Sequence, residues 1–144
     1  MRQISSYMTA DHRRCDEVFS ELEKKVLQKD FDGLDSAFRA FQNDFLTHFK
    51  MEEAVMFPDI EMRTGMQGGP TQVMRMEHEQ MRQVIAQMGA DLQQGDYDHF
   101  LGLAETFIIL VQQHNMKEEQ ILYNMADQIL ADVETSVVER MKAV

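Results

Sequence analysis

The 144-residue chain has no tryptophan, one cysteine, two prolines and seven glycines. Few helix breakers are therefore present, and the abundance of Leu, Met, Gln, Glu and Ala favours helix. The lone Cys15 excludes an internal disulfide and is typical of a reducing compartment, so we expect a cytoplasmic protein without a secretory signal. The longest apolar run, Phe107 to Val111, is far too short to span a bilayer.

Positive charge is also scarce, since 14 Lys and Arg residues face 25 Asp and Glu residues and give a net charge of −11. This balance disfavours nucleic acids and anionic membrane surfaces as partners. The length suits one domain with a single hydrophobic core. We expect residues 1–144 to form that domain, with a bundle over about 8–130 and a C-terminal extension over 131–144.

Apolar residues recur with helical spacing along nearly the whole chain, and no strand-like alternation is present. Helices are predicted over about 9–28, 34–62, 71–94 and 97–130, with a short helical extension afterwards. Thr9 or Asp11 is the expected cap of the first helix, and Pro58 is expected to kink the second. Long helices joined by short turns predict an all-α, up-down-up-down four-helix bundle.

Each predicted helix carries one histidine in its apolar stripe, at positions 12, 48, 78 and 114. His12 and His48 are equally far from the first turn, and His78 and His114 are equally far from the third. Because α-helices rise 1.5 Å per residue, each hairpin should bring its two histidines to one height. Four imidazoles in a dry core repel each other when protonated, and a bound metal removes this conflict.

Two carboxylates complete this pattern, because Glu52 follows His48 by one helical turn and Glu118 follows His114 in the same way. Both can reach inward from opposite sides and bridge two cations. Four histidines and two bridging glutamates suit a dinuclear site with two histidines per metal. This ligand set favours iron, with manganese or zinc as alternatives.

Taken singly, these signals have ordinary explanations. One His-x-x-x-Glu is a common surface pair, and one histidine in an apolar stripe is usually a core residue. The combination of two repeats, four stripes and matched heights is what predicts a metal site. The remaining candidates are interpreted as solvated side chains (Glu53, Glu77, Glu79, Glu119), a surface residue (His99), a buried thiol (Cys15) and two tyrosines that no pattern assigns to the site (Tyr7, Tyr123).

Four short motifs resemble the hemerythrin-like family of His-His-Glu cation-binding domains: "DHRRCD" at 11–16, "HFKME" at 48–52, "EHEQM" at 77–81 and "HNMKE" at 114–118. The resemblance covers about residues 8–130. It implies a four-helix bundle that holds two iron ions through histidines and bridging carboxylates and binds dioxygen. By position, it implies that His12 and His48 bind one iron, His78 and His114 bind the other, and Glu52 and Glu118 bridge them.

The sequence departs from the oxygen-carrying members of that family. Their third helix has two histidines one turn apart, whereas His78 has Met74 and Arg82 at those places. Their last motif also ends in Asp after a gap of four, whereas Glu118 follows a gap of three. The second iron then lacks a protein ligand, and water, the gas or a neighbouring carboxylate must replace it. Asp16, one turn from His12, is a further candidate ligand or hydrogen-bond acceptor.

The resemblance implies a diiron protein that binds dioxygen or nitric oxide at an open iron position. The alternative is a diiron oxidase, a peroxidase or a nitric-oxide-detoxifying enzyme, which the missing histidine favours. The Glu-x-x-His pattern of ferritin-like oxidases is absent. A regulatory module that responds to iron or oxygen and a structural zinc site are weaker alternatives.

Overall fold

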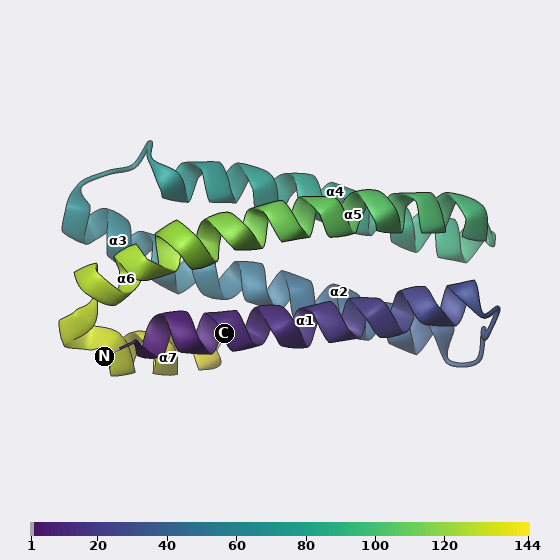
Figure 1. Ribbon diagram of the computed structural model, residues 1–144, viewed down its shortest axis with the longest axis horizontal. Helices are drawn as coiled ribbons and strands as arrows, with labels where there is room; N and C mark the ends of the chain where they lie inside the picture. The colour runs from purple at the N-terminus through teal and green to yellow at the C-terminus, as the bar shows by residue number, and fades with distance from the viewer. Residues whose placement is uncertain (1) are drawn as a thin grey trace.

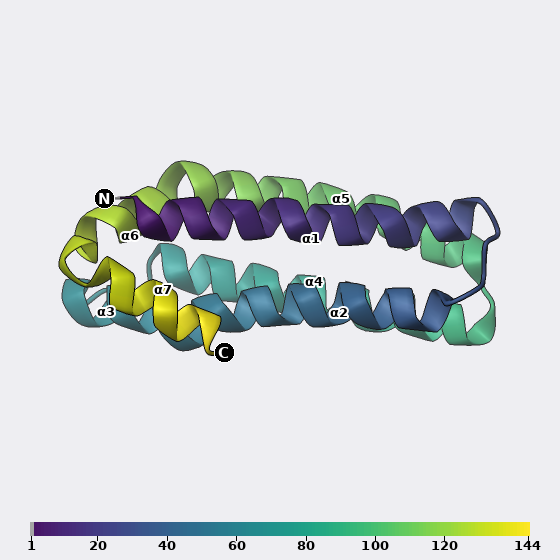
Figure 2. The ribbon, with the colours of Figure 1, turned by 90° about the horizontal axis from the view of Figure 1, so that it is seen from below.

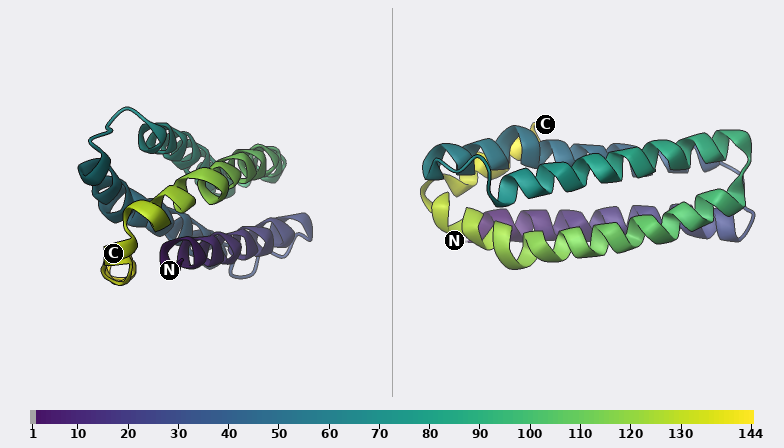
Figure 3. Two further views of the ribbon diagram at one scale, coloured as in Figure 1. Left: turned by 60° about the vertical axis from the view of Figure 1, so that its left-hand side comes forward. Right: turned by 90° about the horizontal axis from the view of Figure 1, so that it is seen from above.

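The computed structural model of the protein describes residues 2–144, which form helices joined by turns and contain no strand. Long helices run back and forth along the molecule and surround a common core (Figures 1 and 3). The four principal helices are α1 (Gln3–Leu27), α2 (Leu34–Met51), α4 (Pro70–Gln94) and α5 (Tyr97–Lys117). The predicted all-α, up-down-up-down bundle is confirmed.

Each principal helix forms one rod of the bundle, and two of these rods continue through short π-helical segments. In such a segment the hydrogen-bonded turn is one residue longer than in an α-helix. After α2 come η1 (Glu52–Met56) and α3 (Phe57–Thr64), and after α5 come η2 (Glu118–Leu122) and α6 (Tyr123–Ile129). The predicted extension consists of a 3₁₀ turn, η3 (Ala131–Val133), and a fifth helical rod, α7 (Glu134–Lys142). Figure 2 shows α7 folded back at the end of the bundle that holds α3 and α6.

The sequence marks most helix ends correctly. Gly95 follows α4 with a φ of 71°, a left-handed conformation that costs glycine little, and the Asp96 side chain accepts a hydrogen bond from the His99 backbone N–H at the start of α5. The first helix is the exception, because it begins at Gln3 rather than near residue 9. Thr9 and Asp11 therefore lie inside the helix, and the prediction that one of them caps it is wrong.

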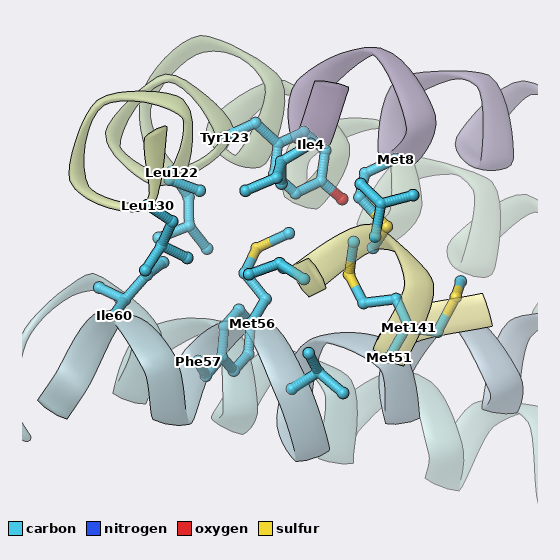
Figure 4. Close-up of a cluster of buried hydrophobic side chains, with 14 of the residues drawn as sticks. Ile4, Met8, Met51, Met56, Phe57, Ile60, Leu122, Tyr123, Leu130 and Met141 are labelled. Carbon is cyan, nitrogen blue, oxygen red and sulfur yellow. The ribbon is translucent and has the colours of Figure 1, made fainter. Parts of the chain in front are cut away.

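The buried apolar residues form two clusters, one toward each end of the bundle. One contains an aromatic group in which Phe41, Phe45 and Phe107 have ring centroids 5.1–5.3 Å apart, within the usual range for offset and edge-to-face pairs. The other, shown in Figure 4, packs α3, α6 and α7 against the start of α1. α1 and α4 each contribute to both clusters, with His12 and His78 between the two contributions, whereas α5 contributes only to the cluster that contains the aromatic group.

The second π segment changes which residues of the last rod face the core. Uniform helical spacing from His114 and Glu118 predicts that Ile121 and Met125 face the core. The Ile121 side chain is instead 54% exposed, whereas Leu122 and Tyr123 are buried. The extra residue in the π turn advances the inward face by one position, since each helical residue turns the chain by about 100°. The prediction for Ile121 is therefore wrong.

No helix within residues 2–144 is both long and apolar enough to cross a membrane.

Candidate metal centre

The six residues predicted as metal ligands lie together in the middle of the bundle. Their donor atoms form two groups, each within 4.8 Å: one contains His12, His48, Glu52 and Glu118, and the other contains Glu52, His78, His114 and Glu118. All six side chains are at most 4% exposed. Each group therefore has two histidines of its own and shares both glutamates with the other group.

Each hairpin supplies one histidine pair, as the distances from the turns predicted. The imidazole centroids of His12 and His48 are 4.5 Å apart, and those of His78 and His114 are 4.9 Å apart. The two members of each pair come from adjacent antiparallel helices, α1 with α2 and α4 with α5. Equal rise per residue along both helices accounts for the match.

The Nε2 atoms of the histidines point at the shared carboxylates. Nε2 of His12 lies 3.0 Å from Glu118 Oε1, and Nε2 of His114 lies 3.2 Å from the same oxygen. On the other glutamate, Nε2 of His78 lies 2.9 Å from Glu52 Oε1, and Nε2 of His48 lies 3.6 Å from Glu52 Oε2. The imidazoles and carboxylates thus converge on a common centre.

The outer nitrogen of every histidine, Nδ1, contacts a second carboxylate from the neighbouring helix. The four pairs are His48 with Asp11 at 2.7 Å, His78 with Glu53 at 2.6 Å, His114 with Glu77 at 2.8 Å and His12 with Glu119 at 2.8 Å. Together they form a closed ring of contacts around the bundle, from α1 to α2, α4, α5 and back to α1. Such carboxylates fix the orientation of a metal-binding imidazole and make it a stronger ligand.

This ring corrects part of the sequence interpretation. Glu53, Glu77 and Glu119 were expected to be solvated, but each is partly buried against a histidine. Only Glu79, with its side chain 63% exposed, behaves as expected. The sequence signal was missed because each carboxylate bonds to a histidine on another helix and not to its own neighbour in the chain.

The other candidate residues lie outside the two donor groups. Asp16 is not the acceptor for His12, since Glu119 takes that place. Met74 packs in an apolar cluster, and Arg82 pairs with Glu53, so neither replaces the missing histidine beside His78.

Two residues that the sequence analysis did not assign to the metal site lie in the surroundings predicted for them. His99 is a surface residue, as predicted, and contacts Asp91. Cys15 is buried, and burial raises the pKa of its thiol, which fits the prediction of an inert core residue.

Both π-helical segments begin at a shared glutamate, Glu52 in η1 and Glu118 in η2. Pro58 lies just after the first segment but has no counterpart after the second, so a proline is not what they have in common. Instead, each segment ends with a hydrogen bond from the backbone N–H five residues after the glutamate to the glutamate carbonyl. Such bulges occur frequently at functional sites.

The electrostatics of the centre favour cations. Burial alone would lower the pKa of His48, but the charge of Glu52 and the contact with Asp11 raise it to about 10. Burial is likewise outweighed at His114, where the charge of Glu118 raises the pKa to about 9. Burial would raise the pKa of Glu52, yet His48 holds it well below its usual value. Positive charge must therefore accompany the buried carboxylates, as protons or as metal ions.

Protons alone leave part of the centre unsatisfied. Glu52 Oε1, Glu118 Oε2, His78 Nε2 and His114 Nε2 are buried and lack a hydrogen-bond partner of acceptable geometry, although His78 Nε2 lies 2.9 Å from Glu52 Oε1. Buried polar atoms without partners are costly. A metal ion would satisfy all four, because imidazole and carboxylate atoms are its usual ligands. The residues present thus fit a metal centre.

Tyr123 is the functional neighbour that sequence reasoning did not assign. Its side chain is fully buried, and its hydroxyl lies 2.6 Å from Glu52 Oε2 and 3.0 Å from Glu118 Oε1. Burial and the charges of both glutamates raise its pKa well above the usual value. Figure 4 labels Tyr123 in the apolar cluster beside the centre and draws its hydroxyl oxygen in red.

The helical bundle and its buried histidine–glutamate groups together define a metal-binding domain. The model of the hemerythrin HHE cation-binding domain matches residues 3–126, so the chain belongs to this family. Comparisons with curated proteins and with solved structures find no significant match.

Proposed function

We propose that the protein is a non-haem diiron protein that binds dioxygen or a related small ligand such as nitric oxide. It would act in the binding or sensing of oxygen, iron or nitric oxide. The observation that carries the proposal is the pair of four-residue donor groups that share Glu52 and Glu118. Two groups with two carboxylates in common suit two neighbouring metal ions bridged by those carboxylates.

Iron is the metal we propose, because two imidazoles and two carboxylates form a mixed set that suits iron in such bundles. Manganese and zinc accept the same donor types and remain the alternatives for this site. When bound, iron would supply the redox chemistry and an exchangeable ligand position. The chain itself supplies the oriented imidazoles, the bridging oxygens and an apolar surrounding.

Small openings flank the centre and suit ligands of a few atoms. A cavity of about 110 Å³ lies between α4 and α5, and His114, Glu77 and Lys117 are among its lining residues. A second, of about 310 Å³, includes His12 and Glu119. Each cavity has a histidine of the centre among its lining residues, so each lies next to the centre.

The second candidate function is an enzyme: a diiron oxidase, a peroxidase or a nitric-oxide-detoxifying protein. One observation favours it, because Met74 and Arg82 occupy the places one turn either side of His78 where a further histidine would bind metal. A metal with fewer protein ligands is more accessible to oxidants.

We further propose that residues 1–144 form one domain and that it acts in the cytoplasm, since the lone Cys15 suits a reducing compartment.

Metal counting tests the assignment of the ligands. The protein, loaded anaerobically with Fe(II) and freed of excess metal, should contain two irons per chain. Glu118→Gln should lose at least one of them, because its carboxylate belongs to both donor groups. Glu79→Gln is the matched control, since Glu79 is exposed and has no contact with the centre. Equal iron contents in the two variants would refute the bridging role of Glu118.

The optical spectrum then separates the two candidate functions. Reduced, iron-loaded protein is exposed to air and afterwards degassed. A visible band that appears and then fades on degassing indicates reversible binding, as in a carrier or sensor. A diferric spectrum that degassing does not reverse indicates rapid oxidation and favours the enzyme.

A further inference from the structure

The two donor groups are alike in their histidines and carboxylates but differ in one hydroxyl. Tyr123 Oη lies 3.0 Å from His12 Nε2 and 3.3 Å from His48 Nε2, in addition to its contacts of 2.6 and 3.0 Å with Glu52 and Glu118. It is therefore close to all four donors of the His12–His48 group. By contrast, Nε2 of His78 and Nε2 of His114 have no hydrogen-bond partner among the described residues, so no hydroxyl takes the same place beside these two histidines.

Most of the distances in this group suit ligands around one octahedral metal ion, and the 3.6 Å between His48 Nε2 and Glu52 Oε2 is the exception. Ligands about 2.1 Å from a metal are about 3 Å apart when adjacent and about 4 Å apart when opposite. His12 Nε2 and Glu118 Oε1, at 3.0 Å, are spaced as adjacent ligands, and His48 Nε2 and Glu118 Oε1, at 4.0 Å, as opposite ones. Tyr123 Oη, at 2.6–3.3 Å from all four donors, is placed as a ligand adjacent to each of them.

The π segment brings Tyr123 to this place. Its backbone N–H bonds to the carbonyl of Glu118, five residues earlier, so the two side chains project on the same side of the rod. In an uninterrupted α-helix the residue four positions after Glu118, Leu122, would take that place. The bulge thus replaces an aliphatic side chain by a phenol.

The first π segment provides an internal comparison. Phe57 follows Glu52 by five residues, its backbone N–H bonds to the Glu52 carbonyl, and its ring stacks on His78 with centroids 5.8 Å apart. Tyr123 stacks on His12 in the same way, at 5.4 Å. Equivalent residues of the two hairpins are 66 positions apart, as in His12 and His78. The matched aromatic side chain lacks a hydroxyl beside the second donor group.

We propose that Tyr123 Oη is a fifth protein ligand of the metal held by His12 and His48, and that the metal held by His78 and His114, beside Phe57, is the open one. The inference rests on the dinuclear centre proposed above. Coordination replaces the O–H bond of the phenol by a bond from oxygen to the metal, and the proton leaves to solvent. Small ligands would then bind at the His78–His114 metal, which has no fifth protein ligand.

A ferric phenolate has a visible charge-transfer band and enhanced phenolate ring vibrations in the resonance Raman spectrum, and this signature tests the proposal. The protein, Tyr123→Phe and Tyr7→Phe are loaded anaerobically with Fe(II), analysed for iron and oxidised with ferricyanide. Tyr7 is a suitable control because its hydroxyl lies 4.0 Å from Met51 Sδ and outside both donor groups. Helical circular dichroism verifies the fold, and Phe57 shows that an aromatic ring without a hydroxyl fits in the matched place.

We expect two irons per chain in all three proteins and a phenolate signature that is absent only from Tyr123→Phe. Two irons without the signature in the unchanged protein, or a signature that persists in Tyr123→Phe, would overturn the ligand assignment and leave the dinuclear centre intact. Fewer than two irons in the unchanged protein would instead refute the proposed function, and this inference with it.

A second variant tests the open position and does not depend on the stability of Tyr123→Phe. Phe57→Tyr adds a hydroxyl beside the His78–His114 metal and should increase the phenolate band. It should also weaken the binding of azide, a small anionic probe titrated against the oxidised protein, whereas Tyr123→Phe should not. Unchanged azide binding in Phe57→Tyr, with an increased phenolate band, would show that the open position lies elsewhere.

Discussion

Replacing Asp11 by Asn should weaken metal binding by about tenfold to a hundredfold without removing any metal ligand. Asp11 Oδ2 contacts Nδ1 of His48 at 2.7 Å, on the side of the imidazole that faces away from the centre. An asparagine oxygen still accepts this hydrogen bond, so the ring stays oriented. The negative charge is lost, and the imidazole becomes a weaker donor to a metal.

The size of the effect follows from burial. A tenfold to hundredfold loss corresponds to about 1.4–2.7 kcal/mol of binding free energy. Asp11 should lie at the upper end, since only 10% of its side chain is exposed and water screens its charge little. Glu119→Gln should lie at the lower end, because 34% of that side chain is exposed beside His12. Glu79→Gln, outside the ring, should change the affinity by less than about twofold.

The assay is a competition between each variant and a chromophoric chelator for Fe(II), carried out anaerobically at one pH. Asp11 also binds Arg14, so urea unfolding of the metal-free variants is needed to separate lost stability from lost affinity. The reasoning fails if Asp11→Asn and Glu79→Gln bind metal equally well, or if Glu119→Gln is weakened more than Asp11→Asn.

Two further predictions concern stability. Removing the metal with a chelator should lower the melting temperature by about 10 °C, because metal at a concentration a hundredfold above Kd stabilises the folded state by about 2.7 kcal/mol. Calorimetry measures this difference, and an unchanged melting temperature would show that metal does not bind the folded state preferentially. The contacts of His99 with Asp91, and then the charge of Asp96, raise the pKa of His99 in the folded protein. The contribution of His99 to the free energy of unfolding is therefore fully present below its unfolded pKa of about 6.5, and it is lost as pH rises through the folded pKa. The urea midpoint of metal-free protein should therefore exceed that of His99→Gln at pH 6 and approach it at pH 9, and an advantage that grows with pH would contradict this.

The parts of the site that the sequence predicted depend on regular geometry. His12 precedes the first turn by as many residues as His48 follows it. Because both helices rise equally per residue, the two histidines could be placed at one height. Glu52 and Glu118 could be placed beside their histidines because residues four apart share a helical face. The structure brings these residues together where that geometry expected them.

The parts that were missed depend on departures from regular geometry and on contacts between helices. Tyr123 was not assigned because uniform spacing places Ile121 inward, and only the π segment reverses that order. No local pattern distinguishes a helix with such a bulge from one without it. Glu53 and Glu77 were interpreted as solvated because their histidine partners belong to other helices.

The repeated His-x-x-x-Glu-Glu motif has a physical explanation in this ring of contacts. In the second copy, His114 and Glu118 turn toward the centre, and the following Glu119 contacts His12 on the next helix. The first copy does the same, with Glu53 contacting His78.

The two remaining contacts come from acidic residues that directly precede the other two histidines of the centre. Asp11, before His12, contacts His48, and Glu77, before His78, contacts His114. These four contacts form a closed ring only if helices that are consecutive in the chain are also neighbours in the bundle. Up-down-up-down topology provides that order, so the motif and the fold satisfy one geometric requirement. If α2 and α4 lay diagonally across the bundle, Glu53 and Glu119 would lose their contacts with His78 and His12.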